Sequence, residues 1–271
     1  MEINKKSTNA KLIAVDLDGT LLQSNKKYSS QTTNYLKALK EKGNIIVIAT
    51  GRILNFAIHV TDGAEFANYL ISDAGATIYD VANRKVISKK KIDYEEVIKI
   101  CSEYAPTWNR INICDEENYN IYTNEDYKVR EFEKIILDKL EFLGNSREVT
   151  HVSVIVKQDE VEKVKERLQA LLPHLRITIM QDSFSDKKWV EIFNKEVDKY
   201  NAIKEIAEKE NIELQDIISF GDGLNDIEMI KRSGVGVAMG NALPEVKENA
   251  KFTTLSNDED GIRFFLKKYL K

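Results

Sequence analysis

LIAVDLDGT, at residues 12–20, begins with four apolar residues, a pattern typical of a short strand buried on both faces. Asp16 and Asp18 follow two residues apart, so their side chains leave an extended chain on the same side. Two carboxylates this close repel each other unless a cation lies between them or one takes a proton. Gly19 then allows a tight turn. The stretch therefore favours a metal or phosphate site at the end of a buried strand, with an ordinary Asp-Gly turn as the alternative.

The composition of the whole chain indicates what kind of protein it is and which partners it lacks. Its 271 residues are 42% hydrophobic and 31% charged, as in a globular protein of one or two domains. The formal net charge of -4 indicates no nucleic-acid partner, and no apolar run approaches the about 18 residues of a membrane span. Cys101 and Cys114 form no Cys-X-X-Cys motif, which favours a reducing environment. We therefore expect a cytoplasmic protein without nucleic-acid or membrane partners.

Further buried strands are predicted on both sides of an insertion. A helical pattern over residues 32–42 leads to a second fully apolar run at 45–49, which together with the first strand predicts a β-α-β unit of a parallel sheet. More strands of this sheet are predicted at Tyr69–Ser72, Trp189–Ile192, Ile217–Phe220 and, as the last strand, Val235–Met239. The predicted fold class is therefore α/β with a parallel central sheet.

The middle of the chain has a different pattern. Its strands alternate apolar and polar positions and its helices carry one apolar face, as at residues 151–156, 160–172 and 175–180. Such strands predict a mostly antiparallel sheet that is open on one side. We interpret residues 83–188 as an α+β domain inserted into a core formed by residues 1–82 and 189–271.

Polar residues follow several of the predicted core strands. Thr50 and Gly51 come directly after the second strand, ahead of an expected helix whose N-terminus favours an anion. A helix cap is the alternative role for Thr50. Asp222 and Asp226 follow the strand at 217–220. Because open parallel sheets bind ligands at the carboxyl ends of their strands, we expect these residues to meet the paired carboxylates of the first strand there.

Four short motifs, taken together, resemble those of the haloacid dehalogenase superfamily. They are DLDGT at 16–20, Thr-Gly-Arg at 50–52, Lys199 ahead of a helix, and GDGLND at 221–226. The sequences VEI at 190–192 and MGNA at 239–242 most resemble the Cof-type branch, subclass IIB. The resemblance covers nearly the whole chain. It implies a Rossmann-like core and an inserted α/β cap domain that selects the substrate.

The chain departs from this branch at two places. Ala74 stands where Asn is usual in an Asn-Gly-Ala sequence. Glu196-Val197-Asp198-Lys199-Tyr200 stands in place of Gly-Val-Ser-Lys-Gly. The departures therefore remove two glycines and an asparagine, residue types that take unusual backbone conformations readily.

The resemblance also implies roles for the motif residues. It implies an Mg²⁺-dependent phosphatase that acts on a small phosphorylated metabolite through an aspartyl phosphate. Asp16 is the implied nucleophile, and Asp18 is the implied general acid and base. The implied metal ligands are Asp16, the carbonyl of Asp18 and Asp222, with Asp226 behind them or acting through water. The groups implied to hold the phosphoryl oxygens are Leu17, Thr50, Gly51, Lys199 and Asn225.

Several alternatives remain at this level. Phosphomutases and phosphohydrolases dedicated to one sugar phosphate share all four motifs. A phospho-metabolite sensor with weak turnover is an alternative of another class, although binding alone would not need the proton-transfer residue Asp18. Arg52 and Asn241 each fit a role in the site or one at the surface. The substrate is expected to be a sugar phosphate or the phosphate of a flavin or vitamin precursor.

Overall fold

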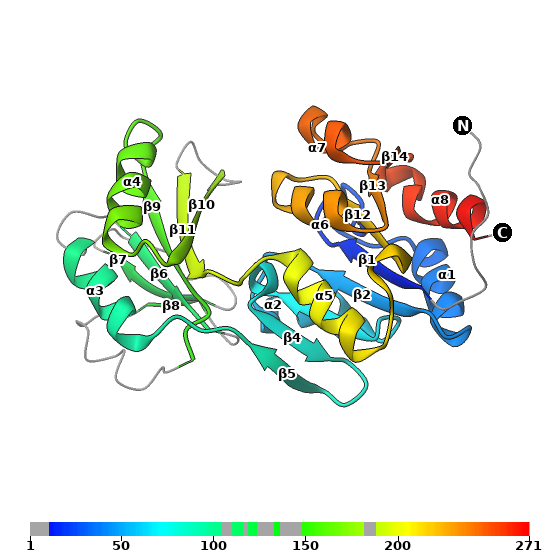
Figure 1. Cartoon of the computed structure of the whole chain (residues 1–271), viewed down its shortest axis with the longest axis horizontal. Coiled ribbons are helices and arrows are strands. Elements are labelled where there is room, and N and C mark those ends of the chain that lie inside the picture. Colours follow the sequence, from blue (N-terminus) through cyan, green and yellow to red (C-terminus); the bar gives the residue numbers. More distant parts are fainter. Residues whose placement is uncertain are drawn as a thin grey trace. The chain divides into compact units, whose positions relative to one another are not determined.

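The computed structural model describes residues 11–104, 110–115, 119–123, 133–135, 148–181 and 188–270. The chain divides into two compact units, and most of their helices and strands are labelled in Figure 1. The first unit runs up to Gly51, resumes over Val60–Ile87 and continues from Asp198. The second comprises Arg52–His59 and Ser88–Val197.

The described part of the first unit is built on an eight-stranded sheet with the order β14-β13-β12-β1-β2-β3-β4-β5. Its strands are β1 (Leu12–Asp16), β2 (Ile45–Ala49), β3 (Tyr69–Ser72), β4 (Thr77–Asp80), β5 (Lys85–Lys89), β12 (Ile217–Gly221), β13 (Val235–Ala238) and β14 (Phe252–Thr253). The pairs from β14 to β3 are parallel, whereas β4 runs antiparallel to β3. The predicted α/β class with a largely parallel sheet is confirmed.

Helices cover both faces of this sheet. The helices of the first unit are α1 (Ser30–Glu41), α5 (Lys199–Lys209), α6 (Ile227–Arg232), α7 (Pro244–Asn249) and α8 (Gly261–Tyr269), whereas nearly all of α2 (Leu54–Val60) is assigned to the second unit. Ile203 of α5 and Met229 of α6 share one apolar cluster with Leu12. Phe220 points to the opposite face, where its ring centroid lies 5.6 Å from that of Phe265 in α8. The sheet is therefore the middle of three layers and is buried from both sides.

The second unit has its own sheet and its own apolar core. Its described elements are α3 (Tyr94–Tyr104), β6 (Arg110–Cys114), β7 (Tyr119–Thr123), β8 (Glu133–Ile135), β9 (His151–Val156), α4 (Val161–Leu171), β10 (Leu175–Gln181) and β11 (Lys188–Asn194). The six strands lie in the order β10-β11-β9-β6-β7-β8, and only the β7–β8 pair among them is parallel. Val97 of α3 and Leu168 of α4 pack with Val154 on one face. The expected mostly antiparallel sheet is present.

The strand predicted at Trp189–Ile192 lies in a different sheet from the one expected. It is β11, which pairs antiparallel with β9 and β10 and not with the parallel sheet. Val190 joins the apolar cluster on one face, while Phe193 stacks on His151 on the other. Apolar side chains on both faces make this antiparallel strand resemble a parallel one in sequence.

Three smaller expectations also differ from the structure. β13 is not the last strand, because the two-residue β14 pairs with it. The sheet continues past β3 through β4 and β5, which were not predicted. Helix α2 begins at Leu54, so Thr50 is not its N-cap. Very short strands and helix boundaries carry too few residues for periodicity to locate them.

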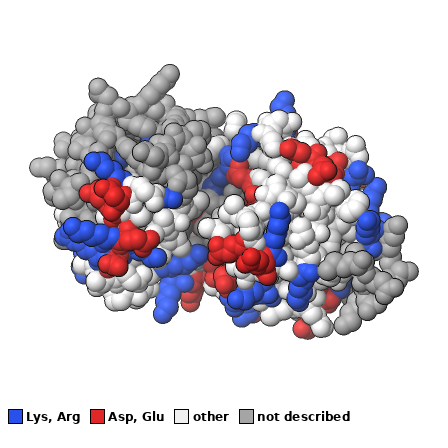
Figure 2. Space-filling view, turned by 90° about the horizontal axis from the view of Figure 1, so that it is seen from above, with Lys and Arg blue, Asp and Glu red and all other residues white. Residues whose placement is uncertain are grey.

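Charged side chains of both signs occur on the molecular surface. On the face shown in Figure 2, basic and acidic side chains of the described residues are interspersed, in keeping with the net charge of -4. None of the helices in the described ranges has both the length and the apolar character needed to cross a membrane.

Ala74 occupies a strained position in the turn after β3. Its φ of 55° and ψ of 19° are left-handed, a conformation that costs an L-residue roughly 1–2 kcal/mol. Glycine avoids this strain but adds about 0.4–1 kcal/mol of unfolded-chain entropy. We expect Ala74→Gly to raise the free energy of unfolding by roughly 0.5 kcal/mol. Urea unfolding followed by circular dichroism measures the change.

Ala38, in the middle of α1, provides the matched control. Ala38→Gly is expected to lower the free energy of unfolding by about 1 kcal/mol, because glycine is a poor helix former. Destabilisation of similar size in both variants would contradict strain at Ala74.

Candidate active site

The predicted site residues lie at one edge of the parallel sheet. Asp16 is the last residue of β1 and pairs in register with Ala49 of β2, which Thr50 follows. Val15 is in register with Phe220 of β12, and Asp222 comes directly after that strand. The carboxyl ends of β1, β2 and β12 therefore bring residues from three separate segments together.

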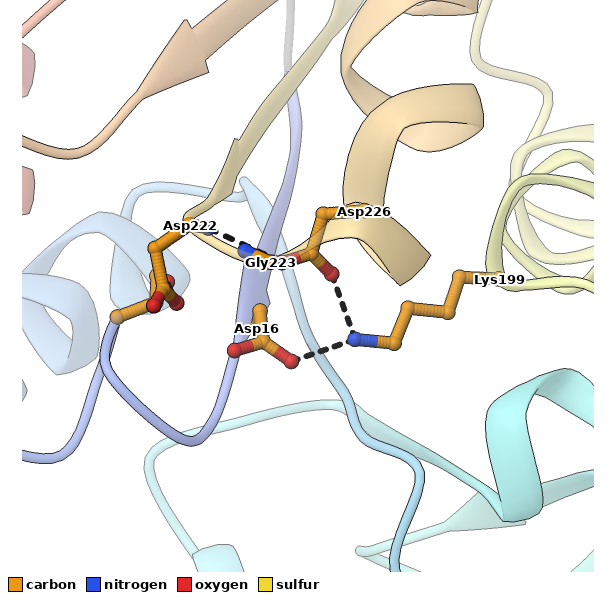
Figure 3. A network of polar contacts seen from close by, with 6 residues as sticks. Asp16, Lys199, Asp222, Gly223 and Asp226 are labelled. Atoms are coloured by element: carbon orange, nitrogen blue, oxygen red, sulfur yellow. Dashed lines mark hydrogen bonds and ion pairs between the residues drawn. The ribbon is translucent and has the colours of Figure 1, made fainter. Parts of the chain in front are cut away.

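A buried lysine connects two of the carboxylates (Figure 3). Lys199 Nζ donates to Asp16 Oδ1 at 2.5 Å and to Asp226 Oδ1 at 2.7 Å. Lys199 is 2% exposed and Asp226 is 1% exposed. The other oxygen of Asp226 accepts the backbone N–H groups of Asp222 and Gly223, each at 3.0 Å. Buried charges need such partners, so this network fixes Lys199 and Asp226 in place.

The turn after β1 holds the side chain of Asp222. Thr20 Oγ1 donates to Asp222 Oδ1 at 2.7 Å. Gly19 has a φ of +79°, and a Cβ on it would lie only 2.3 Å from Asp222 Oδ2. The glycine is therefore required both by its backbone conformation and by the close approach of a carboxylate. Thr20 had no predicted role, although it belongs to the DLDGT motif.

The site concentrates negative charge. One carboxylate oxygen from each of Asp16, Asp222 and Asp226 lies within 4.8 Å of the others. Burial raises the pKa of Asp16 well above its usual value, and the charge of Asp226 adds to this while Lys199 opposes it. Burial likewise raises the pKa of Asp222 to about 6, against the hydrogen bond from Thr20. The anionic forms of both carboxyls are therefore disfavoured unless a further cation is present.

The pKa of Lys199 is shifted in the direction that favours its charged form. Burial alone would lower the pKa of Lys199, but the charges of Asp16 and Asp226 outweigh this and raise it. Lys199 therefore stays protonated, and its positive charge is bonded to two of the three carboxylates. All the donor atoms are oxygens, the set that a hard divalent cation prefers, so the residues fit such an ion.

The remaining predicted residues occupy different environments. Asp18 stands apart from the metal-suited group of carboxylates, with its side chain 40% exposed and one oxygen 3.7 Å from Lys26 Nζ. Leu17 and Thr50 are buried, and Gly51 is half-buried. Asn225 is exposed in the turn Leu224–Asp226. Arg52, whose role was open, belongs to the second unit and places its guanidinium 4.4 Å from the ring of Phe56.

The departures near Lys199 are accommodated by the local structure. Neither Glu196 nor Tyr200, both in the described part of the chain, has a positive φ, so glycine is not needed at either position. Asp198 caps α5 by accepting the N–H of Asn201 at 2.7 Å. Tyr200 is buried in the core, with the guanidinium of Arg232 4.0 Å from its ring. Packing and a cap therefore fix the start of α5.

Asn241 binds the backbone of the first motif. Its Nδ2 donates to the carbonyl of Gly19 at 2.8 Å, and its Oδ1 accepts the N–H of Asn257 at 3.0 Å. Asn241→Asp keeps the size and the acceptor but loses the donor to Gly19. Because a net hydrogen bond contributes about 1 kcal/mol, we expect kcat/KM for p-nitrophenyl phosphate to fall roughly fivefold. Steady-state kinetics measures this.

Asn249 offers a matched control for this prediction. Its Nδ2 donates to a backbone carbonyl, that of Glu245, at 2.9 Å. Asn249→Asp is expected to keep the wild-type kcat/KM. Equal activity of Asn241→Asp and Asn249→Asp would show that the bond to Gly19 does not support the site.

Comparisons with known proteins agree with this geometry. A model of the haloacid dehalogenase-like hydrolase family matches residues 13–266. The chain is 28% identical to the 5-amino-6-(5-phospho-D-ribitylamino)uracil phosphatase YcsE of Bacillus subtilis (strain 168), over 97% of this chain and 96% of that protein.

Two solved structures show the same likeness over 96% of the chain and 99% of each structure, both at 26% identity. One is a haloacid dehalogenase-like hydrolase from Bacteroides thetaiotaomicron, with a TM-score of 0.79. The other is the HAD subclass IIB sugar phosphatase BT4131, with a TM-score of 0.77. The predictions of superfamily, fold class and enzyme class are thereby confirmed. The chain belongs to the haloacid dehalogenase-like hydrolase family and is a phosphatase.

Proposed function

We propose that this phosphatase depends on Mg²⁺ and hydrolyses a small phosphorylated metabolite through an aspartyl phosphate on Asp16. The main support is the position of Asp16 at the end of β1. One of its oxygens is held by Lys199, and the other points toward Asp222 in Figure 3. A carboxylate fixed beside a buried cation and an acidic, metal-suited group can attack a phosphorus atom whose charge has been neutralised.

The proposed cation ligands are Asp16, Asp222 and the backbone carbonyl of Asp18. Asp226 is not proposed as a direct ligand, because its two oxygens already accept hydrogen bonds from Lys199 and from two backbone amides. Mg²⁺ bound there would neutralise charge on the phosphate monoester and on the carboxylates.

The chain's own residues perform the bond-making steps of the proposal. An oxygen of Asp16 bonds to phosphorus as the bond from phosphorus to the leaving oxygen breaks, and Asp18 gives that oxygen its proton. The Asp18 carboxylate then takes a proton from water. The water oxygen bonds to phosphorus as the bond to Asp16 breaks, which returns both residues to their initial state. The partly exposed side chain of Asp18 has the access to water that this role needs.

Other groups of the first unit hold the phosphoryl oxygens in this proposal. Lys199 is positioned by its two carboxylate partners and remains charged because its pKa is raised. The residues proposed to assist it are Thr50 and Asn225 through their side chains, and Leu17 and Gly51 through their backbone N–H groups. All these residues belong to the first unit, so we assign the choice of leaving group to the second unit.

The two relatives described above guide the choice of candidate substrates. One relative is named for 5-amino-6-(5-phospho-D-ribitylamino)uracil and another for sugar phosphates. A panel should therefore contain both of these classes together with p-nitrophenyl phosphate. Release of inorganic phosphate from each compound, in Mg²⁺-containing buffer, gives kcat/KM.

We expect one of the two metabolite classes to exceed p-nitrophenyl phosphate in kcat/KM by at least about tenfold, because remote binding energy raises turnover. Binding of a compound without phosphate release would instead indicate a sensor. Movement of the phosphoryl group between hydroxyls without free phosphate would indicate a mutase.

A further inference from the structure

The turn after β3 touches the backbone of a proposed phosphate-binding residue. This turn, Asp73–Gly75, donates the N–H of Ala74 to the carbonyl of Thr50 at 3.0 Å. The N–H of Thr50 in turn donates to the carbonyl of Ile71 in β3 at 2.9 Å. The backbone of Thr50 is therefore bonded both to β3 and to the turn that ends it.

The same turn supports the start of α5. Gly75 has a φ of +113°, and a Cβ on it would lie 2.3 Å from the carbonyl oxygen of Asp198 and 3.1 Å from the amide nitrogen of Lys199. A contact of 2.3 Å with a backbone atom cannot be relieved by rotating a side chain. With any other residue at this position, either the beginning of α5 or the turn that holds Thr50 would have to shift.

Lys199 is sensitive to such a shift. It is the first residue of α5, its side chain is buried, and its Nζ bonds to carboxylates from two other segments. Asp16 ends a central strand and Asp226 is held by two backbone amides, so neither can follow a displaced lysine. A displacement of about 1 Å at a catalytic site can cost roughly 100-fold in rate.

We infer that Gly75 is a positioning residue for phosphoryl transfer. It sets the position of Lys199 relative to Asp16, and the turn that contains it also holds Thr50. The inference rests on the role proposed above for Lys199. It gives a function to the Ala74-Gly75-Ala76 sequence, to which no part of the proposed chemistry is assigned.

A double-mutant cycle tests this inference. The variants are Gly75→Ala, Lys199→Met and the double variant, assayed with p-nitrophenyl phosphate in single-turnover experiments. We expect Gly75→Ala alone to lower the rate by roughly 10- to 100-fold. In the Lys199→Met background the same change should alter the rate by less than about threefold, since the residue through which Gly75 acts is already gone.

Gly43 supplies the control for backbone strain. It has a φ of +89°, and a Cβ on it would meet nothing within 4 Å. Gly43→Ala therefore carries the conformational penalty without the clash, so it should lower stability and leave the rate unchanged. A purely structural role for Gly75 predicts that both variants lose stability and that neither loses turnover beyond its loss of folded protein.

Each outcome of the cycle decides a separate point. Equal rates for Gly75→Ala and Gly43→Ala, or an equal loss in both lysine backgrounds, would overturn the inference alone. A wild-type rate for Lys199→Met would overturn the proposed role of Lys199 and the inference with it. If Gly75→Ala does not fold, Asp198→Ala replaces it in the cycle, because it removes the cap of α5 without adding atoms. Its several-fold loss of rate should disappear in the Lys199→Met background, and persistence of that loss would overturn the inference.

Discussion

Asp16→Asn is expected to lower kcat by roughly 10⁴- to 10⁶-fold, a range typical of removing a catalytic nucleophile. An amide is uncharged and does not form the acyl phosphate. The fold should be retained, because Asn has nearly the same size and its Oδ1 can still accept from Lys199. Asp226 remains as a charged partner of Lys199 in this variant, so the buried lysine still has an anion beside it.

Initial rates with p-nitrophenyl phosphate measure the effect, and circular dichroism verifies the fold. Acid-quenched enzyme should carry a covalent phosphoryl group in the wild type and none in Asp16→Asn. Near-normal turnover by folded Asp16→Asn would rule out Asp16 as the nucleophile.

Asp216 provides the matched control for this substitution. It is a partly buried carboxylate paired with Lys11. Asp216 precedes β12 and Lys11 precedes β1, so the pair lies at the amino ends of these strands, away from the carboxyl ends that form the site. Asp216→Asn therefore breaks a lysine-carboxylate pair far from the proposed chemistry. It should lose some stability and keep the wild-type kcat/KM, which separates the loss of a buried ion pair from the loss of a nucleophile.

Removal of divalent cations is expected to abolish turnover, and added Mg²⁺ to restore it fully. Asp16, Asp222 and Asp226 approach one another with Lys199 as the cation bonded to two of them, so the site carries excess negative charge. A phosphate dianion could not join these carboxylates without further neutralisation. Ca²⁺ should inhibit, because its larger and looser coordination shell does not reproduce the octahedral geometry of Mg²⁺.

A binding measurement makes this prediction independent of turnover. Mg²⁺ should raise the midpoint of thermal unfolding of the wild type, because an ion that binds only the folded state stabilises it. The increase should be lost in Asp222→Asn and retained in the control Asp216→Asn. Full activity in metal-free buffer, or the same thermal response in Asp222→Asn, would exclude the proposed metal site.

Local sequence patterns were enough to predict the central strands and the acidic motifs at their ends. β1 and β12 are short runs that are buried on both faces, and a continuous apolar pattern is a local property. Asp16 ends β1 and Asp222 directly follows β12. Because the carboxyl ends of parallel strands lie at the same end of a sheet, the two residues could be predicted to lie close together. Lys199 and Asp226 could be assigned to the same site because they belong to recognisable short motifs.

The way in which these groups are held depends on contacts between distant segments of the chain. Thr20 meets Asp222 across 202 positions of the chain, and Asn241 meets the carbonyl of Gly19 across 222. The close approach of Gly75 to Asp198 has no signal in either local sequence. The assignment of β11 to the antiparallel sheet likewise depended on its partners β9 and β10. Local patterns report which face of an element is buried, whereas these contacts depend on where distant segments pack, and that is fixed only when the whole chain folds.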